Sequence, residues 1–192
     1  LGNFAKNVKR VDVFDENDKP LVYQKSTKDL WVIETNGAKK IKVTYSYHTT
    51  EINAGNCYAD ETQLYVNPVH LCLYVPARMQ EEHTLELDIP ENYKVATSLK
   101  KVNKNFVASS FDELADSPIM ASASLQSDFY EVNGIKFWLH FIGECKPDWD
   151  KFKTDFTKFT QTQLNFWKVI PTDDYHFLFQ ILPFHFYHGV EH

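Results

Sequence analysis

Residues 41–48, IKVTYSYH, alternate strictly between apolar and polar side chains. This two-residue period is typical of a strand in a half-buried antiparallel sheet, because successive side chains point to opposite faces. A similar run occupies 84–89, and the more continuously apolar residues 69–74 predict a central strand. Turn compositions rich in Asp, Asn and Gly separate such runs at 15–18, 35–37 and 53–56. This first part of the chain therefore predicts an antiparallel β-sandwich.

A different pattern begins near residue 120. Residues 111–115 predict one helical turn, which Pro118 ends because the residue before a proline avoids helical geometry. Farther on, Asn133-Gly134 separates the apolar runs 129–132 and 135–142 and is the strongest short signal for a two-residue hairpin turn. We therefore predict a mainly β chain with two units, a β-sandwich domain over 1–122 and the start of an α+β domain over 123–192.

A long helix is predicted over residues 149–168, with Asp148 as its N-terminal cap, and a last strand over 175–182. Aromatic residues recur in the helix at steps of three and four, the period of one helical face, at Trp149, Phe152, Phe156, Phe159 and Phe166. We interpret this stripe as a buried face, and we expect Phe152, Phe156 and Phe159 to lie in the core. Full burial of such a ring stabilises the fold by roughly 1.5–3 kcal/mol.

Composition excludes several classes of function. The formal charge is −6, from 20 basic and 26 acidic residues, which argues against a nucleic-acid partner. No apolar run approaches the roughly 18 residues of a membrane-spanning helix, so we expect a soluble chain without a membrane span. The sequence does not determine the cellular compartment. If an N-terminal signal peptide has been removed, the protein is periplasmic or secreted.

The cysteines indicate neither a disulfide framework nor a zinc knuckle. There are three, Cys57, Cys72 and Cys145, an odd number without C-x-x-C spacing. His70 and Cys72 stand two apart on a predicted strand and would form half of a metal site, but no second pair at ligand spacing accompanies them.

The end of the sequence is richest in reactive side chains. Residues 188–192, HGVEH, have the spacing H-x-x-E-H, in which His188 and His192 would bind zinc from one face of a helix. The stretch contains Gly189, follows a predicted strand and has no third ligand. A loop or edge strand is therefore the simpler interpretation, with zinc binding by His188 and His192 as the alternative.

Four segments carry a resemblance to a known family. They are FAKNV at 4–8, FDELADSPI at 111–119, YHFLF at 175–179 and GVEH at 189–192. In this order the chain resembles, over essentially its whole length, the glycyl aminopeptidase family of zinc metallopeptidases, relatives of the aminopeptidase N and thermolysin group. The last segment is similar to the family's Gly-Leu-Glu-His signature, with Val in place of Leu.

The resemblance implies a β-rich N-terminal domain, its first strands missing here, followed by the first hairpin, helix and strand of a thermolysin-like catalytic domain. It further implies that Glu191 holds the free α-amino group of a peptide substrate, that Gly189 lets the peptide backbone approach, and that His192 supports this contact. A carboxylate facing an ammonium group would select amino-terminal residues through a charge-assisted hydrogen bond.

The sequence departs from the family in one decisive respect, because it contains no H-E-x-x-H motif. We therefore expect no catalytic residue and no cofactor in this chain, with zinc, its ligands and the rest of the catalytic domain belonging to a longer parent protein. On this interpretation the chain is an inactive middle slice of a zinc aminopeptidase. The rival is a noncatalytic β-sandwich module that binds protein or carbohydrate through exposed aromatics, with Trp31, Tyr58 and Tyr65 as candidates.

Overall fold

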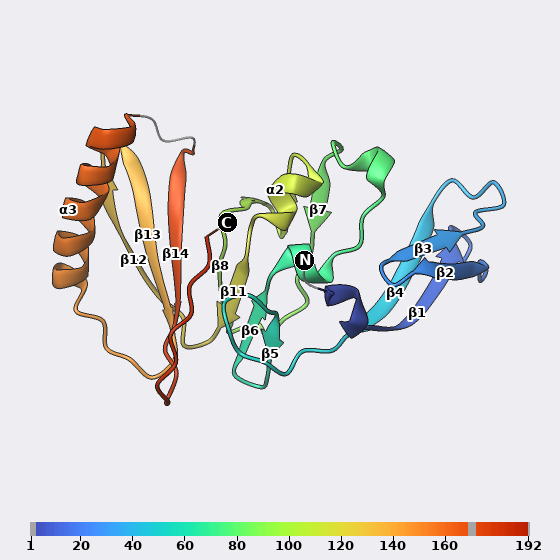
Figure 1. Ribbon diagram of the computed structural model, residues 1–192, viewed down its shortest axis with the longest axis horizontal. Helices are drawn as coiled ribbons and strands as arrows, with labels where there is room; N and C mark the ends of the chain where they lie inside the picture. The colour runs from blue at the N-terminus through green and yellow to red at the C-terminus, as the bar shows by residue number, and fades with distance from the viewer. Residues whose placement is uncertain (1–2, 169–171, 192) are drawn as a thin grey trace.

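The chain is mainly β and forms several small sheets, which follow one another along the long axis of the molecule (Figure 1). The computed structural model describes residues 3–168 and 172–191. At one end lie two antiparallel pairs, β1 (Val8–Asp15) with β4 (Ile41–Tyr47) and β2 (Tyr23–Thr27) with β3 (Leu30–Ile33). The strand predicted from the alternating stretch is therefore confirmed as β4.

Two antiparallel sheets form the middle of the molecule. One has the order β5 (Tyr58–Ala59), β6 (Gln63–Val66), β11 (Ile119–Ser122) and β8 (Lys94–Ala96). The other has the order β7 (His83–Leu85), β10 (Asn105–Ala108) and β9 (Lys100–Val102). Short helical segments lie between strands: η1 (Phe4–Asn7), α1 (Pro68–Leu71), η2 (Pro76–Arg78) and α2 (Phe111–Ala115). Every residue of β11 is buried, so this strand runs through the core.

The strand predicted at 69–74 is wrong. Residues 68–71 form the helical turn α1, in which the amide of Cys72 donates to the carbonyl of Pro68 at 2.8 Å. Pro68 occupies the first helical turn, where its fixed φ favours a helix and its missing N–H costs nothing. Consequently His70 and Cys72 do not share a strand face, and the half metal site inferred from them does not form. The strand predicted at 84–89 is also shorter, since only β7 is regular there.

The helical turn predicted at 111–115 is confirmed as α2, and its start is held by side chains. The Ser110 hydroxyl accepts a hydrogen bond from the Glu113 amide at 3.2 Å. The Glu113 carboxylate in turn accepts from the Ser109 amide at 2.6 Å. These reciprocal bonds satisfy amides that have no partner within a helix, which stabilises a turn too short to persist alone.

The last sheet contains β12 (Gln126–Val132), β13 (Ile135–Ile142) and β14 (Asp174–Gln180). The predicted hairpin is confirmed, since Asn133 and Gly134 both have positive φ, 54° and 80°, as the favoured two-residue turn requires. β14 pairs parallel to β13, and α3 (Trp149–Trp167) provides the crossover between them. The predicted cap is also confirmed, because Asp148 accepts a hydrogen bond from the Lys151 amide at 3.0 Å.

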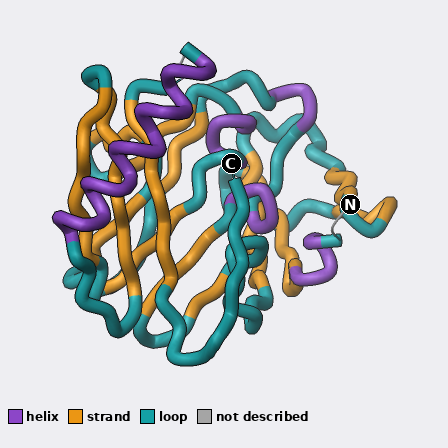
Figure 2. Tube along the Cα trace, turned by 60° about the vertical axis from the view of Figure 1, so that its left-hand side comes forward, coloured by secondary structure: helices purple, strands orange, loops and turns teal. Residues whose placement is uncertain are grey.

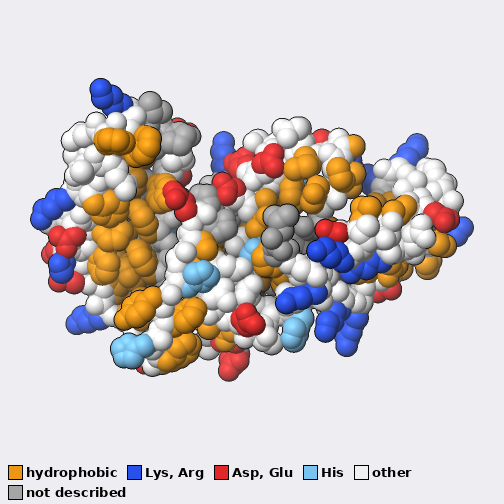
Figure 3. All heavy atoms as spheres, in the orientation of Figure 1, with side chains coloured by type: hydrophobic (Ala, Val, Ile, Leu, Met, Phe, Trp, Pro, Cys, Tyr) orange, Lys and Arg blue, Asp and Glu red, His pale blue; other side chains and the backbone are white. Residues whose placement is uncertain are grey.

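Helix α3 lies across one face of this sheet (Figure 2). The core beneath it consists of buried β12 and β13 residues, with α3 and β14 aromatics packed around them: Tyr130, Val132, Phe137, Leu139 and Phe141, then Trp149, Phe152, Phe156, Tyr175, Phe177 and Phe179. An apolar band is visible along this side of the molecule (Figure 3). The helix therefore packs through its aromatic face, as predicted.

The predicted stripe is wrong at its C-terminal part. Phe159 is 37% exposed, although it contacts Phe156 and Phe177, and Phe166 is 75% exposed. Each residue advances the helix by about 100°, so Phe166 stands about 80° around the helix from Phe156, beyond the buried face. The α3 residue that is fully buried is Thr160, whose hydroxyl shares a 2.8 Å hydrogen bond with the Tyr130 hydroxyl.

Candidate functional site

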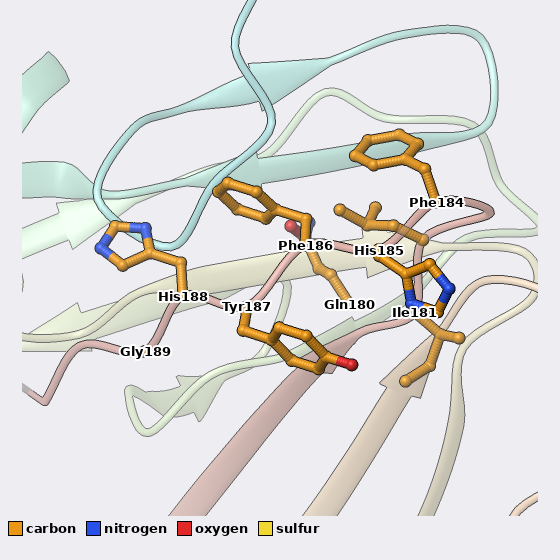
Figure 4. A pocket seen from close by; sticks show the side chains of 9 residues that line it. Gln180, Ile181, Phe184, His185, Phe186, Tyr187, His188 and Gly189 are labelled. Atoms are coloured by element: carbon orange, nitrogen blue, oxygen red, sulfur yellow. The ribbon is translucent and has the colours of Figure 1, made fainter.

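A surface pocket of about 610 Å³ lies where the chain leaves β14 (Figure 4). Its walls come from one stretch of chain: Gln180, Ile181, Leu182, Phe184, His185, Phe186, Tyr187, His188 and Gly189. Phe184, Phe186 and Tyr187 are exposed, and Tyr187 is 90% accessible to solvent. The pocket is therefore open and rich in aromatic and imidazole groups.

The segment 181–191 turns back after β14 and runs beside that strand (Figures 1 and 2). The turn is fixed where the Ile181 amide donates to the Ile142 carbonyl at 2.9 Å. Burial and then the charge of Glu191 raise the pKa of Tyr175, which places Glu191 near the start of β14. The segment also passes close to Gly55, because a Cβ added to Gly55 would stand 3.4 Å from a ring carbon of His188.

The structure brings Gly189 and Glu191 to the same exposed segment. Gly189 lines the pocket, and nothing lies within 4 Å of the position where its Cβ would stand. Glu191 is exposed, so its carboxylate is accessible to a ligand. His192, the third residue of the predicted set, lies outside the described residues.

The helix that the H-x-x-E-H alternative requires is not formed over 188–191, which has no regular secondary structure. His188 lies against the turn at Gly55 rather than one helical turn from a second imidazole. Within residues 3–168 and 172–191, no group of three or more His, Cys, Asp or Glu side chains could hold a metal ion.

A second polar cluster lies on the face of the last sheet opposite α3, and the sequence analysis missed it. The Ser127 hydroxyl is 2.8 Å from Nδ1 of His140, and Nε2 of His140 is 3.1 Å from Nδ1 of His176. Nε2 of His176 is in turn 3.3 Å from a carboxylate oxygen of Asp174. The signal that could have revealed it is the i, i+2 spacing of Asp174 and His176, which places both on one face of a strand.

Burial controls the charge of this cluster. His140 is 5% exposed, and burial together with the neighbouring His176 lowers the pKa of His140 to about 4. Burial lowers the pKa of His176 as well, while Asp174 acts in the opposite direction. Both imidazoles are therefore neutral at pH 7.

The cysteines are free thiols and are poorly suited to nucleophilic or metal chemistry. Burial raises the pKa of Cys72 to about 11, and burial also raises the pKa of Cys57 and of Cys145. A thiol with a raised pKa carries little thiolate at neutral pH, and the thiolate is the reactive and ligating form. These residues fit structural roles.

One of the three aromatic residues proposed as the binding surface of a noncatalytic module is buried. Tyr65 is only 5% exposed, and its hydroxyl donates to the Ala54 carbonyl at 3.0 Å. The prediction that Tyr65 is an exposed aromatic is therefore wrong. The amine of Lys25 lies over the ring of Trp31, 4.5 Å from its centroid. The Tyr58 hydroxyl donates a hydrogen bond to the Asp60 carboxylate at 3.0 Å.

The described architecture, small antiparallel sheets leading into a hairpin, a crossover helix and a parallel strand, recurs in a solved structure. An aminopeptidase N family protein from Idiomarina loihiensis superposes on 94% of this chain with a TM-score of 0.84 and 24% sequence identity. This chain spans only 32% of the length of that protein. The similarity establishes the fold that the two proteins share.

Residues 1–123 match the family described as the Peptidase M61 N-terminal domain. The chain therefore belongs to this peptidase family, which confirms the resemblance drawn from its four sequence segments. A comparison with curated protein sequences gives no match. Among the described residues, no helix has both the length and the apolar character needed to cross a membrane.

Proposed function

We propose that this chain is the N-terminal portion of a zinc-dependent aminopeptidase that removes residues from the amino end of peptides. The family match over residues 1–123 carries this proposal. In it, residues 1–122 are an antiparallel β-sandwich domain, and residues 123–192 begin a thermolysin-like catalytic domain. The zinc ligands belong to additional chain, since the 192 residues contain no H-E-x-x-H and a protein of the same fold is about three times as long.

In this proposal the segment after β14 binds the amino end of the substrate. The Glu191 carboxylate accepts hydrogen bonds from the substrate ammonium, Gly189 leaves room for the peptide backbone, and His192 supports the contact. Two observations support this arrangement: Glu191 is accessible, and Gly189 lines an open pocket. A charge-assisted hydrogen bond distinguishes a free amino terminus from a blocked one, because the blocked end offers no cation.

Changing Glu191→Gln in a full-length peptidase containing this chain tests the proposal. We expect kcat/KM on peptides with a free amino terminus to fall by roughly tenfold to a few hundredfold, because one charge-assisted contact contributes about 1.5–3 kcal/mol. N-acetylated peptides should lose much less. The exposed Glu86→Gln serves as the matched control and should change neither rate. Equal losses on blocked and unblocked peptides, with zinc content preserved, would contradict the role of Glu191.

A second prediction concerns the chain by itself. We expect zinc to leave the thermal unfolding midpoint of the 192-residue chain unchanged, because a metal bound only by the folded state would raise it. The chain should also fail to hydrolyse peptides. Calorimetry with added zinc is the measurement, and His188→Ala is the comparison. A stoichiometric zinc site that this substitution abolishes would restore the H-x-x-E-H alternative.

A further inference from the structure

We propose that His140 and His176 form a proton-operated latch between β13 and β14, closed when both imidazoles are neutral and opened by proton uptake. The two rings belong to neighbouring parallel strands, and the angle between their planes is 8°. Their facing nitrogens are 3.1 Å apart, a hydrogen-bond distance. Such a hydrogen bond requires one of the two facing nitrogens to be protonated and to donate, and the other to be unprotonated and to accept.

The groups at the two ends of the cluster favour one direction of this hydrogen bond. The negative charge of the Asp174 carboxylate, 3.3 Å from Nε2 of His176, favours the proton of that ring on Nε2 and leaves Nδ1 as an acceptor, although the approach does not have hydrogen-bond geometry. His140 must then donate from Nε2, and its Nδ1 accepts from the Ser127 hydroxyl at 2.8 Å. The same tautomer, with the proton on Nε2, is thus required at both histidines. Both rings are neutral in this closed state.

An added proton disfavours the closed state at either ring, but for a different reason at each. A proton on Nδ1 of His176 would place two N–H groups head to head across the contact. A proton on Nδ1 of His140 would leave the contact in place but would put a charge on a ring that is 5% exposed. Trp138, stacked beside both rings at 13° and 19°, contributes to this dry environment.

Few charged side chains on the sheet face of His140 and His176 could stabilise a protonated imidazole there. Side chains alternate along a strand, so the charged residues that share the face are Asp174 on β14, Lys136 on β13 and Glu131 on β12. Lys136 has its amine over the rings of Phe129 and Trp138, at 4.9 and 6.0 Å, and a cation there disfavours a second one. Where the sheet meets the next one, the packing around Leu178 is apolar.

The pH range of the latch follows from the sign of the pKa shift. The folded-state pKa of His140 is lowered from 6.5 to about 4. As pH falls below about 6.5, the unfolded or opened state binds protons first, so the closed state is progressively disfavoured until the folded pKa is reached. The latch is therefore fully effective above about pH 6.5 and weakens between there and pH 4. Since β14 leads directly into the segment 181–191, opening would also loosen the walls of the pocket.

Nitrogen NMR of the histidine rings and amide hydrogen exchange on the intact chain test the latch. We expect both rings to be neutral Nε2–H tautomers at pH 7, and His140 to titrate near pH 4. Amide protection, corrected for intrinsic rates, should fall at acidic pH in β14 before it falls in β10. A charged ring at pH 7, an Nδ1–H tautomer at either histidine, a His140 pKa near 6.5, or parallel loss of protection in the two strands would overturn the proposal.

The variant with His140→Leu and His176→Leu removes both titrating groups at similar volume, and the exposed His48→Gln is the matched control. Between pH 6.5 and 4.5 the folding equilibrium constant of the wild type should fall at least about 40-fold more than that of the double variant, which is the change that lowering the His140 pKa from 6.5 to about 4 produces. His48→Gln should behave as the wild type. Equal pH dependence of double variant and wild type would overturn the latch, and if the double variant does not fold, the NMR titration of the wild type decides.

Discussion

Replacing Gly143 with alanine is expected to destabilise the protein by about 3 kcal/mol or more. Gly143 follows β13 and has a φ of +106°, which side-chain-bearing residues rarely adopt. An added Cβ would overlap the carbonyl oxygen of Ile181 and stand 3.1 Å from its carbonyl carbon. The backbone of Ile181 cannot easily retreat, because its amide is bonded to the Ile142 carbonyl at 2.9 Å. Strain and overlap therefore act together at the turn that begins the pocket segment.

Gly134→Ala is the matched control for this prediction. Gly134 also has a positive φ, +80°, but nothing lies within 4 Å of its added Cβ. Alanine there should cost only the backbone strain, about 1–2 kcal/mol. Urea unfolding of both variants measures the difference. If Gly143→Ala cost no more than Gly134→Ala, the close approach of Ile181 to Gly143 would not exist in solution.

Local signals in the sequence were sufficient for several elements. Asn133-Gly134 predicts its hairpin because the turn requires two residues that tolerate positive φ, and both have it. Asp148 predicts the start of α3 because its carboxylate can accept from an amide three residues ahead, and it does so at Lys151. In each case the deciding interaction lies within a few residues, so sequence alone could identify it.

The predictions that failed concern residues whose structure depends on tertiary contacts. Residues 69–74 have the composition of a buried strand, but Pro68 starts a helical turn just before them. Phe166 continues the spacing of the aromatic stripe, yet it is exposed, because the buried face of α3 is set by how the helix crosses the sheet. Thr160 shows the converse, since its burial depends on the Tyr130 hydroxyl thirty residues away.

The two polar sites differ in how far the sequence could reveal them. The prediction of Glu191 and Gly189 rests on a family resemblance, because a segment as short as 189–192 has no periodicity that predicts a site. The contact of His140 with His176 joins residues 36 apart in the chain and depends on the parallel register of β13 and β14. Parallel pairing requires a crossover helix, so its register cannot be read from a turn.

Replacing Leu139 with alanine is expected to destabilise the protein by about 2–5 kcal/mol. Leu139 lies in the middle of β13, is 0% exposed and faces α3 within the aromatic core. Its loss would remove apolar contacts and leave a cavity that neighbouring rings of Phe137 and Phe141 cannot fill without leaving their own packing. Chemical unfolding at pH 7 measures the effect, away from the range in which the buried histidines titrate.

Phe166→Ala removes a larger side chain and serves as the comparison. Phe166 is 75% exposed at the end of α3, so we expect its loss to change the free energy of unfolding by no more than about 0.5 kcal/mol. The aromatic spacing of the helix predicts the opposite order, because Phe166 belongs to the repeating stripe. A loss at Phe166 as large as the loss at Leu139 would mean that the end of α3 is covered in solution, by a second molecule or by additional chain.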